Sequence, residues 1–577
     1  MKKVKFLLGN EAIALGAIEA GIRFAVSYPG TPASEIQKAF MEFSEKLRIN
    51  SFAKWMVNEK VAFESALGAS WCNMDAMVSM KQVGLNVACD PLMSSAYTGT
   101  KGALVIVSAD DPGPHSSQTE QDSRFLAMFA KIPVFDPSSP QDAKRLMIEA
   151  VKLSKNHKIP VMLRPVLRVS HSRGTVEIGE VKEEDREITF NKEPERFAAT
   201  PKYRYLLHKE LNAKIREIGI INARNLIELL KELNSEEPLY ITSGIFYAIA
   251  KDLGIKNVLK VDMPYPIDRS FFDYVLENFK EIWVLEETYP VIEIQFSARS
   301  KVKGRLSGHI PLEGEIDINL LNDIIFGKKK KVEIKEEEKK PRLCPGCGHR
   351  PVFYLMRKIF PKGIYPGDIG CYTLGVNLNA VDTCLCMGAS ISQAIGISKA
   401  INKEKIKTPV LCTIGDSTFI HAGIPALIEA ANSKAPIIVI ILNNKTTAMT
   451  GGQPVHDVNF ESLAIACGIK KVEKAYAYDI EDISAKLKLL WEYTGSSSMP
   501  SVLIVNSPCV TYQKAERVKR RSAPRVMEEV CSNCGICYKI FECPAIIERK
   551  NKAVILDELC RGCRVCIEIC PTRAIRD

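Results

Sequence analysis

PVLCTIGDS (residues 409–417) and IIVIILNN (residues 437–444) carry the most informative pattern in this chain. Each begins with a short run of aliphatic and β-branched residues, which predicts a buried β-strand. The first strand ends on Gly415-Asp416-Ser417 and the second on Asn443-Asn444. A helical segment separates them, so we expect two parallel strands of an α/β sheet, with both polar motifs at the sheet edge where ligands bind.

The residue types at this edge suit a metal-bound diphosphate. A carboxylate from Asp416 and a carboxamide from Asn444, with backbone carbonyls, are ligands that Mg²⁺ prefers. Gly415 is expected to let the backbone turn close to the phosphates. Each dipeptide is common by chance, but the 25 residues between Ser417 and Asn443 make the pair more specific. The alternative is a plain βαβ unit with a polar loop.

The end of the chain carries a second pattern, in which eight of the 18 cysteines lie within residues 531–577. They form two CxxCxxC runs, each followed by a Cys-Pro, and the second run has the spacing of bacterial-type ferredoxins. In that arrangement the last cysteine of each run ligates the other cluster. We therefore predict two [4Fe-4S] clusters and one-electron transfer, with zinc as the alternative. The two predicted ligand sets are Cys531, Cys534, Cys537 and Cys570, and Cys560, Cys563, Cys566 and Cys543.

The first cysteine run departs from the usual spacing. Five residues separate Cys537 from Cys543, where the second run has three. We expect the enlarged loop to bulge outward with Cys543 retained as a ligand. The alternative is a lost ligand and a three-iron cluster.

Composition narrows the class of protein. At 577 residues, with 46% hydrophobic residues, the chain has room for about three or four domains. No apolar run approaches the ~18 residues that span a bilayer, so we expect no membrane segment and a cytoplasmic location. In that reducing compartment cysteines are metal ligands or free thiols. The net charge of +10 accompanies abundant Lys and Glu, and no nucleic-acid-binding motif is present.

The two strand-end motifs resemble the signature of thiamine diphosphate enzymes, a GDG triplet followed at similar spacing by NN. That resemblance implies that Asp416, Asn444 and the carbonyl of Thr446 hold Mg²⁺. It also places Gly415, Ser417 and Asn443 at the cofactor. Ser417 stands where the commonest form has glycine, which leaves the metal ligands intact.

Thiamine enzymes also need a glutamate against the aminopyrimidine ring, supplied by a separate α/β domain. Glu59 in VNEKVAFESALGAS (residues 57–70) opens an apolar helical segment and is the candidate. The alternative is a first-turn glutamate that only complements the helix dipole.

Longer motifs extend the resemblance over essentially the whole chain. The chain resembles the large (alpha) subunits of the indolepyruvate:ferredoxin oxidoreductases, within the 2-oxoacid:ferredoxin oxidoreductases. The resemblance implies oxidative decarboxylation of an aryl 2-oxo acid to an aryl-acetyl-CoA and CO₂, with CoA as co-substrate. The motifs that carry it are YPGTPASE (28–35), NEKVA (58–62), MKQVGLNVACDPL (80–92), SADDPGPHSSQTEQDSR (108–124), CPGCGHR (344–350), IGCYTLG (369–375) and DTCLCMGAS (382–390).

The resemblance also implies further site residues. Thr31 matches a substrate-binding threonine, and Thr31-Pro32 reads as a helix N-cap followed by proline at the first helical position. Arg124 is a weaker substrate candidate, with a structural ion pair to Asp110 or Asp111 as its alternative. Met387 and His349 are candidates for the cofactor pocket.

Four more cysteines match those that hold a proximal cluster in relatives. The resemblance implies a third [4Fe-4S] cluster beside the thiamine site; the alternative is that the CPGCGH loop only shapes that site and binds no iron. The four are Cys344, Cys347, Cys371 and Cys509.

The predicted fold class is α/β, with several parallel-sheet domains and a small α+β ferredoxin domain. The resemblance implies a small (beta) subunit as partner, an αβ unit that pairs to α2β2, and ferredoxin as electron acceptor. A non-oxidative thiamine-dependent decarboxylase and an electron carrier with a non-catalytic thiamine fold remain as alternatives. The predicted domains are a pyrimidine-binding domain (1–170), a middle α/β domain (171–327), a charged linker (328–341), a diphosphate-binding domain (342–515) and a two-cluster ferredoxin domain (525–577).

Overall fold

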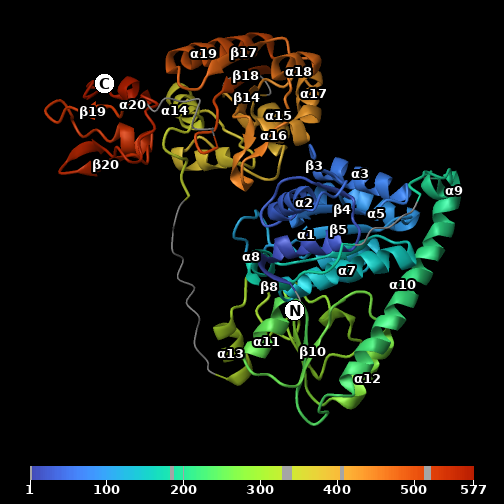
Figure 1. Ribbon diagram of the computed structural model, residues 1–577. Helices are drawn as coiled ribbons and strands as arrows, with labels where there is room; N and C mark the ends of the chain where they lie inside the picture. The colour runs from blue at the N-terminus through green and yellow to red at the C-terminus, as the bar shows by residue number, and fades with distance from the viewer. Residues whose placement is uncertain (1–2, 182–186, 199, 328–340, 403–407, 513–521) are drawn as a thin grey trace. The chain divides into compact units, whose positions relative to one another are not determined.

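The computed structural model describes residues 3–181, 187–198, 200–327, 341–402, 408–512 and 522–577. It divides the chain into two compact units, Met1–Lys335 and Glu336–Asp577 (Figure 1). All but one residue of the predicted linker 328–341 lies outside the described residues.

The first unit is built around a parallel six-stranded sheet with the order β3-β2-β4-β5-β7-β6. The strand predicted at 103–108 is β5, and all of its residues are buried, as expected for a parallel sheet covered on both faces. The strands are β2 (Phe24–Ser27), β3 (Phe52–Trp55), β4 (Ala76–Lys81), β5 (Leu104–Ala109), β6 (Val134–Phe135) and β7 (Val161–Leu163). The helices are α1 (Gly9–Glu19), α2 (Ser34–Lys46), α3 (Glu59–Trp71), α4 (Gln82–Val87), α5 (Cys89–Thr98), α6 (Ser123–Ala130), α7 (Pro140–His157) and α8 (Leu167–His171).

A separate strand pair closes this domain. β8 (Arg173–Glu177) runs antiparallel to β1 (Val4–Leu8), and Val176 packs with Leu7. β8 therefore packs on this domain although it lies beyond the predicted boundary at 170.

A long helix connects this domain to the middle one. Helix α10 (Pro201–Leu230) is longer than the segment 205–218 expected from the sequence. Its first half places Leu211 and Ile218 in the core of the first domain, and its second half places Leu226 in the core of the middle domain. One helix serves two cores, so its apolar residues do not follow a single stripe. Figure 1 shows it running along the side of the unit, between α9 (Pro194–Phe197) and α12.

The middle domain has a parallel sheet with the order β10-β9-β11-β12. The strands predicted at 239–242 and 282–285 match β9 and β11. Its elements are β9 (Leu239–Thr242), α11 (Ile245–Asp252), β10 (Val258–Lys260), α12 (Arg269–Asn278), β11 (Ile282–Leu285), η1 (Glu293–Gln295), β12 (Val302–Lys303) and α13 (Ile318–Phe326).

The second unit contains a parallel four-stranded sheet with the order β13-β14-β18-β17. β13 and β14 are the two strands expected from the quoted segments, and they are adjacent. The strands are β13 (Leu411–Gly415), β14 (Ile438–Asn443), β17 (Val472–Tyr476) and β18 (Ser501–Asn506), with a small hairpin of β15 (Thr446–Thr447) and β16 (Gln453–Pro454). The helices are α14 (His349–Ile359), η2 (Cys371–Leu378), α15 (Ala389–Ile401), α16 (Asp416–Thr418), η3 (Phe419–Gly423), α17 (Ile424–Asn432), η4 (Ala448–Thr450), α18 (Phe460–Ala466) and α19 (Ile480–Ser497).

The cysteine-rich tail is a small domain with internal repetition, as predicted. Each CxxCxxC run leads into a short helix, and two antiparallel strand pairs complete the domain. The expectation that the enlarged loop bulges outward is wrong for its last part. Phe541 is only 2% exposed and packs among core residues of the neighbouring α/β domain, such as Tyr354. The elements are β19 (Arg525–Val526), η6 (Ile536–Ile540), β20 (Ile546–Arg549), β21 (Lys552–Ile555), α20 (Val565–Ile569) and β22 (Ile575–Arg576).

None of the helices in the described ranges combines the length and the apolar character needed to cross a bilayer.

A buried charge network joins the first and middle domains. The Arg124 guanidinium is fully buried and donates to Asp122, Asp136 and Ser243, and to the carbonyls of Glu287 and Tyr289. All five of its N–H groups therefore have protein acceptors.

A second arginine completes the network. Arg164 pairs with Asp110 at 2.6 Å and donates to the carbonyl of Glu287. Burial raises the pKa of Asp110 to about 6 and that of Glu286 to about 7. Burial also acts to raise the pKa of Asp122, but the two arginines hold it well below its usual range.

Replacing Arg124 tests whether this network holds the domains together. Arg124→Met leaves Asp122 and Asp136 buried without their partner, so we expect the free energy of unfolding to fall by about 3–5 kcal/mol. Urea unfolding followed by tryptophan fluorescence measures it. Arg269→Met is the matched control, because Arg269 forms an exposed i,i+4 pair with Asp273 worth about 0.3–0.5 kcal/mol. Unchanged stability with weakened substrate binding would instead support the substrate role predicted for Arg124.

Candidate functional site

The motifs Gly415-Asp416-Ser417 and Asn443-Asn444 meet at the carboxyl edge of the second unit's sheet. β13 and β14 pair in register, with Gly415 opposite Leu442. Asp416 therefore lies beside the end of β14. Its carboxylate accepts hydrogen bonds from the backbone N–H groups of Asn444 at 3.1 Å and Lys445 at 2.6 Å.

The oxygen donors at this edge fit a hard cation. Burial raises the pKa of Asp416 to about 6, while the N–H groups of Ser417, Lys445 and Asn444 oppose that rise. A carboxylate has about four lone-pair sites, so Asp416 retains acceptor capacity after three hydrogen bonds. Asn444 Oδ1 accepts a hydrogen bond from Thr446 N at 3.0 Å, which brings the three predicted ligands together.

Gly415 lies against an aromatic ring. Its φ of −80° is open to any residue. A Cβ there would lie 2.3 Å from Cε1 of Tyr372. The Tyr372 hydroxyl forms hydrogen bonds with the Thr418 hydroxyl and the carbonyl of Ile369. Glycine is needed because an aromatic ring crosses the strand end, and Tyr372 is a residue that the sequence reasoning missed.

The other predicted cofactor residues differ in their surroundings. Asn443 Nδ2 donates to Asn506 on the adjacent strand at 2.8 Å, so one of its amide N–H donors is already used. Thr447 donates to the Ser417 hydroxyl at 3.4 Å. Met387 is half-buried and precedes Gly388, the N-cap residue of α15.

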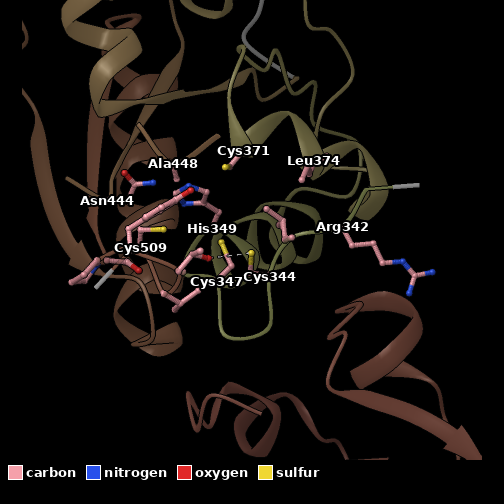
Figure 2. Close-up of a pocket in the computed structure, with 16 residues that line it drawn as sticks. Arg342, Cys344, Cys347, His349, Cys371, Leu374, Asn444, Ala448 and Cys509 are labelled. Atoms are coloured by element: carbon pink, nitrogen blue, oxygen red, sulfur yellow. Dashed lines mark hydrogen bonds between the residues drawn. The ribbon is translucent and has the colours of Figure 1, made fainter. Parts of the chain in front are cut away.

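The four proximal cysteines line one cavity of about 180 Å³, together with His349 and Asn444 (Figure 2). They come from three distant segments: Cys344 and Cys347 precede α14, Cys371 begins η2, and Cys509 follows β18. Figure 2 shows their sulfur atoms turned toward the same cavity. The cavity therefore connects the cysteine set with the diphosphate edge of the sheet.

Burial dominates the electrostatics of this cavity. It raises the pKa of Cys347 to about 12 and that of Cys371 to about 11. It also lowers the pKa of His349 to about 4, so this imidazole is neutral at neutral pH. Buried thiolates need a compensating positive centre, and iron supplies one.

The tail cysteines gather in the two predicted sets. Cys543 lines a small cavity of about 20 Å³ with Cys560, Cys563 and Cys566. The pKa of Cys537 is raised to about 12, first by burial and then by the nearby Cys534, Cys531 and Cys570. Over the described residues, no group of three or more His, Cys, Asp or Glu side chains is placed so that it could hold a single metal ion. A cubane differs from such a site, because each of its thiolates binds a different iron.

A separate group of candidates lies at the sheet edge of the first unit. Glu59 is the first residue of α3, and the Asn58 side chain caps the helix by accepting from Val61 N. Glu59 is only 5% exposed. Its carboxylate lies over the α-carbon of Gly84, where a Cβ would come within 2.4 Å of Oε1.

The prediction that Thr31 is an N-cap is wrong. Helix α2 begins at Ser34 after Ala33, and the Thr31–Pro32 peptide bond is cis. Thr31 instead lies in the turn before α2. The Ser116 hydroxyl donates to its carbonyl at 3.2 Å, so the loop after β5 closes over this turn.

Lys81 is a functional candidate that the sequence reasoning missed. It is the last residue of β4 and packs against Gly30. A Cβ added to Gly30 would lie 3.0 Å from the Cβ of Lys81. Its ammonium donates to the Ser116 carbonyl at 2.6 Å. Burial lowers its pKa to about 8, and Asp111 opposes that shift. The available signal was a lysine that closes the apolar run AMVSMK (76–81).

Arg124 lies away from these groups in its own network. Because all its donors are used within the interdomain junction, the structure favours the structural alternative. Arg124 pairs with Asp122 and Asp136, and not with Asp110 or Asp111 as that alternative had it. Asp110 pairs with Arg164, and Asp111 accepts from Ser116 and Ser117.

Comparison with known proteins gives matches in all three regions. Residues 368–503 match the C-terminal TPP binding domain of thiamine pyrophosphate enzymes. Residues 15–223 match the thiamine diphosphate-binding domain of pyruvate flavodoxin/ferredoxin oxidoreductases, and residues 553–576 match the 4Fe-4S binding domain.

Relatives match over nearly the full length. Indolepyruvate oxidoreductase subunit IorA of Archaeoglobus fulgidus is 36% identical over 99% of this chain and 97% of its own. The subunit of the same name from Methanothermobacter thermautotrophicus is 36% identical with the same coverage. A solved 2-oxoglutarate:ferredoxin oxidoreductase from Magnetococcus marinus matches at 18% identity and a TM-score of 0.41, covering 52% of this chain and 62% of its own.

The two α/β folds and the cluster-binding tail define a thiamine diphosphate-dependent 2-oxoacid oxidoreductase of the ferredoxin-reducing class. Within that class, the chain belongs to the family of the indolepyruvate oxidoreductase subunit IorA, the large (alpha) subunit.

Proposed function

We propose that this chain is the catalytic subunit of an enzyme that oxidises aryl 2-oxo acids such as indolepyruvate. One arylpyruvate, one CoA and two oxidised ferredoxins give one aryl-acetyl-CoA, one CO₂, two reduced ferredoxins and one proton. The carbon skeleton loses two electrons and each ferredoxin gains one.

The cavity in the second unit carries this proposal. It is lined by Asn444, His349 and four cysteines, so an iron cluster there would adjoin the thiamine site. A non-oxidative decarboxylase has no use for an electron acceptor at that position. The cavity therefore favours oxidation over simple release of an aldehyde.

The residues present fit thiamine diphosphate and Mg²⁺. Asp416, Asn444 and the Thr446 carbonyl would hold the metal, and Gly415, Ser417 and Asn443 would border the diphosphate. When bound, thiamine diphosphate supplies the electron sink for decarboxylation. Glu59 would hold a proton against the aminopyrimidine ring from its buried position on α3.

Lys81 and Thr31 would bind the substrate carboxylate. Both lie in the group of residues closed over by the loop after β5. A half-buried ammonium attracts an anion more strongly than an exposed one, because the local dielectric is lower.

Three [4Fe-4S] clusters would carry the electrons outward: one on the proximal cysteines and two in the tail. We further propose ferredoxin as acceptor, a small (beta) subunit as partner in an α2β2 assembly, and a cytoplasmic location. The 18 cysteines, twelve of them proposed as iron ligands, suit a reducing compartment.

Glu59→Gln tests the activating role together with the reaction. With anaerobic protein, the beta subunit, indolepyruvate, CoA and a dye acceptor, we expect CoA-dependent dye reduction that falls about 10²- to 10⁴-fold in the variant. Glu64→Gln, an exposed position on the same helix, is the control. Aldehyde release without dye reduction in the unmodified enzyme would support the decarboxylase. Absence of both activities would support the electron-carrier alternative.

Iron content tests the proximal cluster. We expect about twelve irons per chain from three cubanes, and about eight in Cys509→Ser if the cluster is lost with its ligand. Cys467→Ser is the control, since Cys467 lies in an apolar core remote from the set. Eight irons in the unmodified chain would remove the proximal cluster from the proposal.

Lys81 gives a pH prediction. The charged form binds the carboxylate and prevails below a pKa of about 8, so kcat/KM for the 2-oxo acid is expected to fall as pH rises above it. Lys81→Arg should remove that limb. Lys81→Met should lower kcat/KM about 10- to 100-fold, as expected for hydrogen bonds to charged groups worth ~1.5–3 kcal/mol. The KM for CoA should be unaffected in the Lys81 variants, and the control Lys60→Met should keep the kcat/KM of the unmodified enzyme. An unchanged alkaline limb in Lys81→Arg would contradict this role.

A further inference from the structure

The two residues that end the enlarged tail loop are anchored from outside the tail. Phe541 and Glu542 immediately precede Cys543, a predicted ligand of the second tail cluster. The Phe541 ring lies edge-on to Tyr354 of α14, with ring centroids 5.6 Å apart. The end of the enlarged loop therefore packs against α14 and is not a free surface bulge.

Arg350 of α14 makes the anchoring hydrogen bonds. It is 1% exposed. One of its terminal nitrogens donates to the carbonyl of Phe541 at 3.1 Å and to that of Glu542. The other donates to the carbonyls of Leu343 and Cys344, in the loop that leads into the proximal cysteines. A single side chain thus binds the backbone beside both cysteine sets.

The charge of this guanidinium is poorly compensated by protein groups. Within the described residues its Nε has no hydrogen-bond acceptor. The Glu542 carboxylate lies 3.9 Å away, and the other contacts are neutral carbonyls. A buried charge is costly unless it is paired. The groups whose charged forms would stabilise the guanidinium are, largest first, Cys543, Cys347, Glu542 and Cys563, so thiolates of both cysteine sets would act on it.

The backbone between the two sets is closely packed. Pro345 and Gly346 of the proximal loop line the same small cavity as Cys543, Cys560 and Cys563. Gly346 has a φ of +72°, and a Cβ there would lie 2.8 Å from Cβ of Arg561. The proximal loop therefore contacts the tail at the second cluster's ligands.

Building on the proposed function, we propose that Arg350 is a positioning residue for electron transfer. It fixes the enlarged loop on the proximal loop, and its charge raises the reduction potential of the cluster held by Cys543, Cys560, Cys563 and Cys566. A positive charge favours the more negative, reduced cluster. That cluster thereby becomes the first acceptor in the tail.

The test is an EPR-monitored redox titration of the anaerobic full chain with dithionite, which needs no substrate. In Arg350→Met we expect one tail cluster to become at least tenfold harder to reduce, which is about 59 mV for one electron. Arg350→Lys should retain most of the potential, because it keeps the charge. Lys539→Gln removes an exposed cation from the same loop and should leave the potential unchanged.

Iron is counted in every variant so that folding and tuning are separated. Full iron with unchanged potentials in Arg350→Met overturns the proposal. So does iron loss in both Arg350 variants, which would show a structural role alone. Failure of the proposed function would appear separately, as absent dye reduction in the unmodified enzyme whose clusters still titrate.

Discussion

The carboxylate of Asp416, held by the N–H groups at the end of the neighbouring strand, is the contact on which the candidate site depends. It can form only because β13 and β14 are adjacent, parallel and in register. Asn444 donates to this carboxylate and its own side chain accepts from Thr446 N, so the three predicted metal ligands lie in adjoining positions. From there the cavity continues to the four proximal cysteines. The sheet register thus determines how the predicted metal ligands lie relative to the four proximal cysteines.

Buried arginines have a comparable role at the joints between domains. Arg124 and Arg164 join the first and middle domains through carboxylates, whereas Arg350 joins the tail to the diphosphate-binding domain mainly through carbonyls. The difference has a chemical consequence. The first network is neutralised by its own acidic residues and serves the fold. The charge of Arg350 is less fully compensated, because its one paired carboxylate among the described residues, Glu542, lies 3.9 Å away, and cysteines predicted to bind iron also act on it.

Strand positions and the cysteine sets were open to prediction, because both depend on local pattern. Residues 239–242 and 282–285 matched β9 and β11, and the two polar motifs met as expected. The errors lie where distant segments meet. Nothing in YPGTPASE reveals that α2 starts only at Ser34, and a ring from Tyr372 over Gly415 cannot be inferred from local sequence. Lys81 was overlooked because its contacts are with Gly30 and Ser116, which lie on other loops.

The enlarged tail loop shows how an irregular spacing acquires meaning only in three dimensions. By spacing alone, the two added residues left open that Cys543 does not bind its cluster. The structure shows that the loop retains Cys543 beside its partner cysteines and uses its last residues to contact Tyr354 and Arg350. An isolated ferredoxin has no such surface to contact, so the usual three-residue spacing suffices there. In this fused domain, the additional length supplies the carbonyls that bind the residues before Cys543 to Arg350. The departure from the ferredoxin pattern is thus explained by the fusion itself.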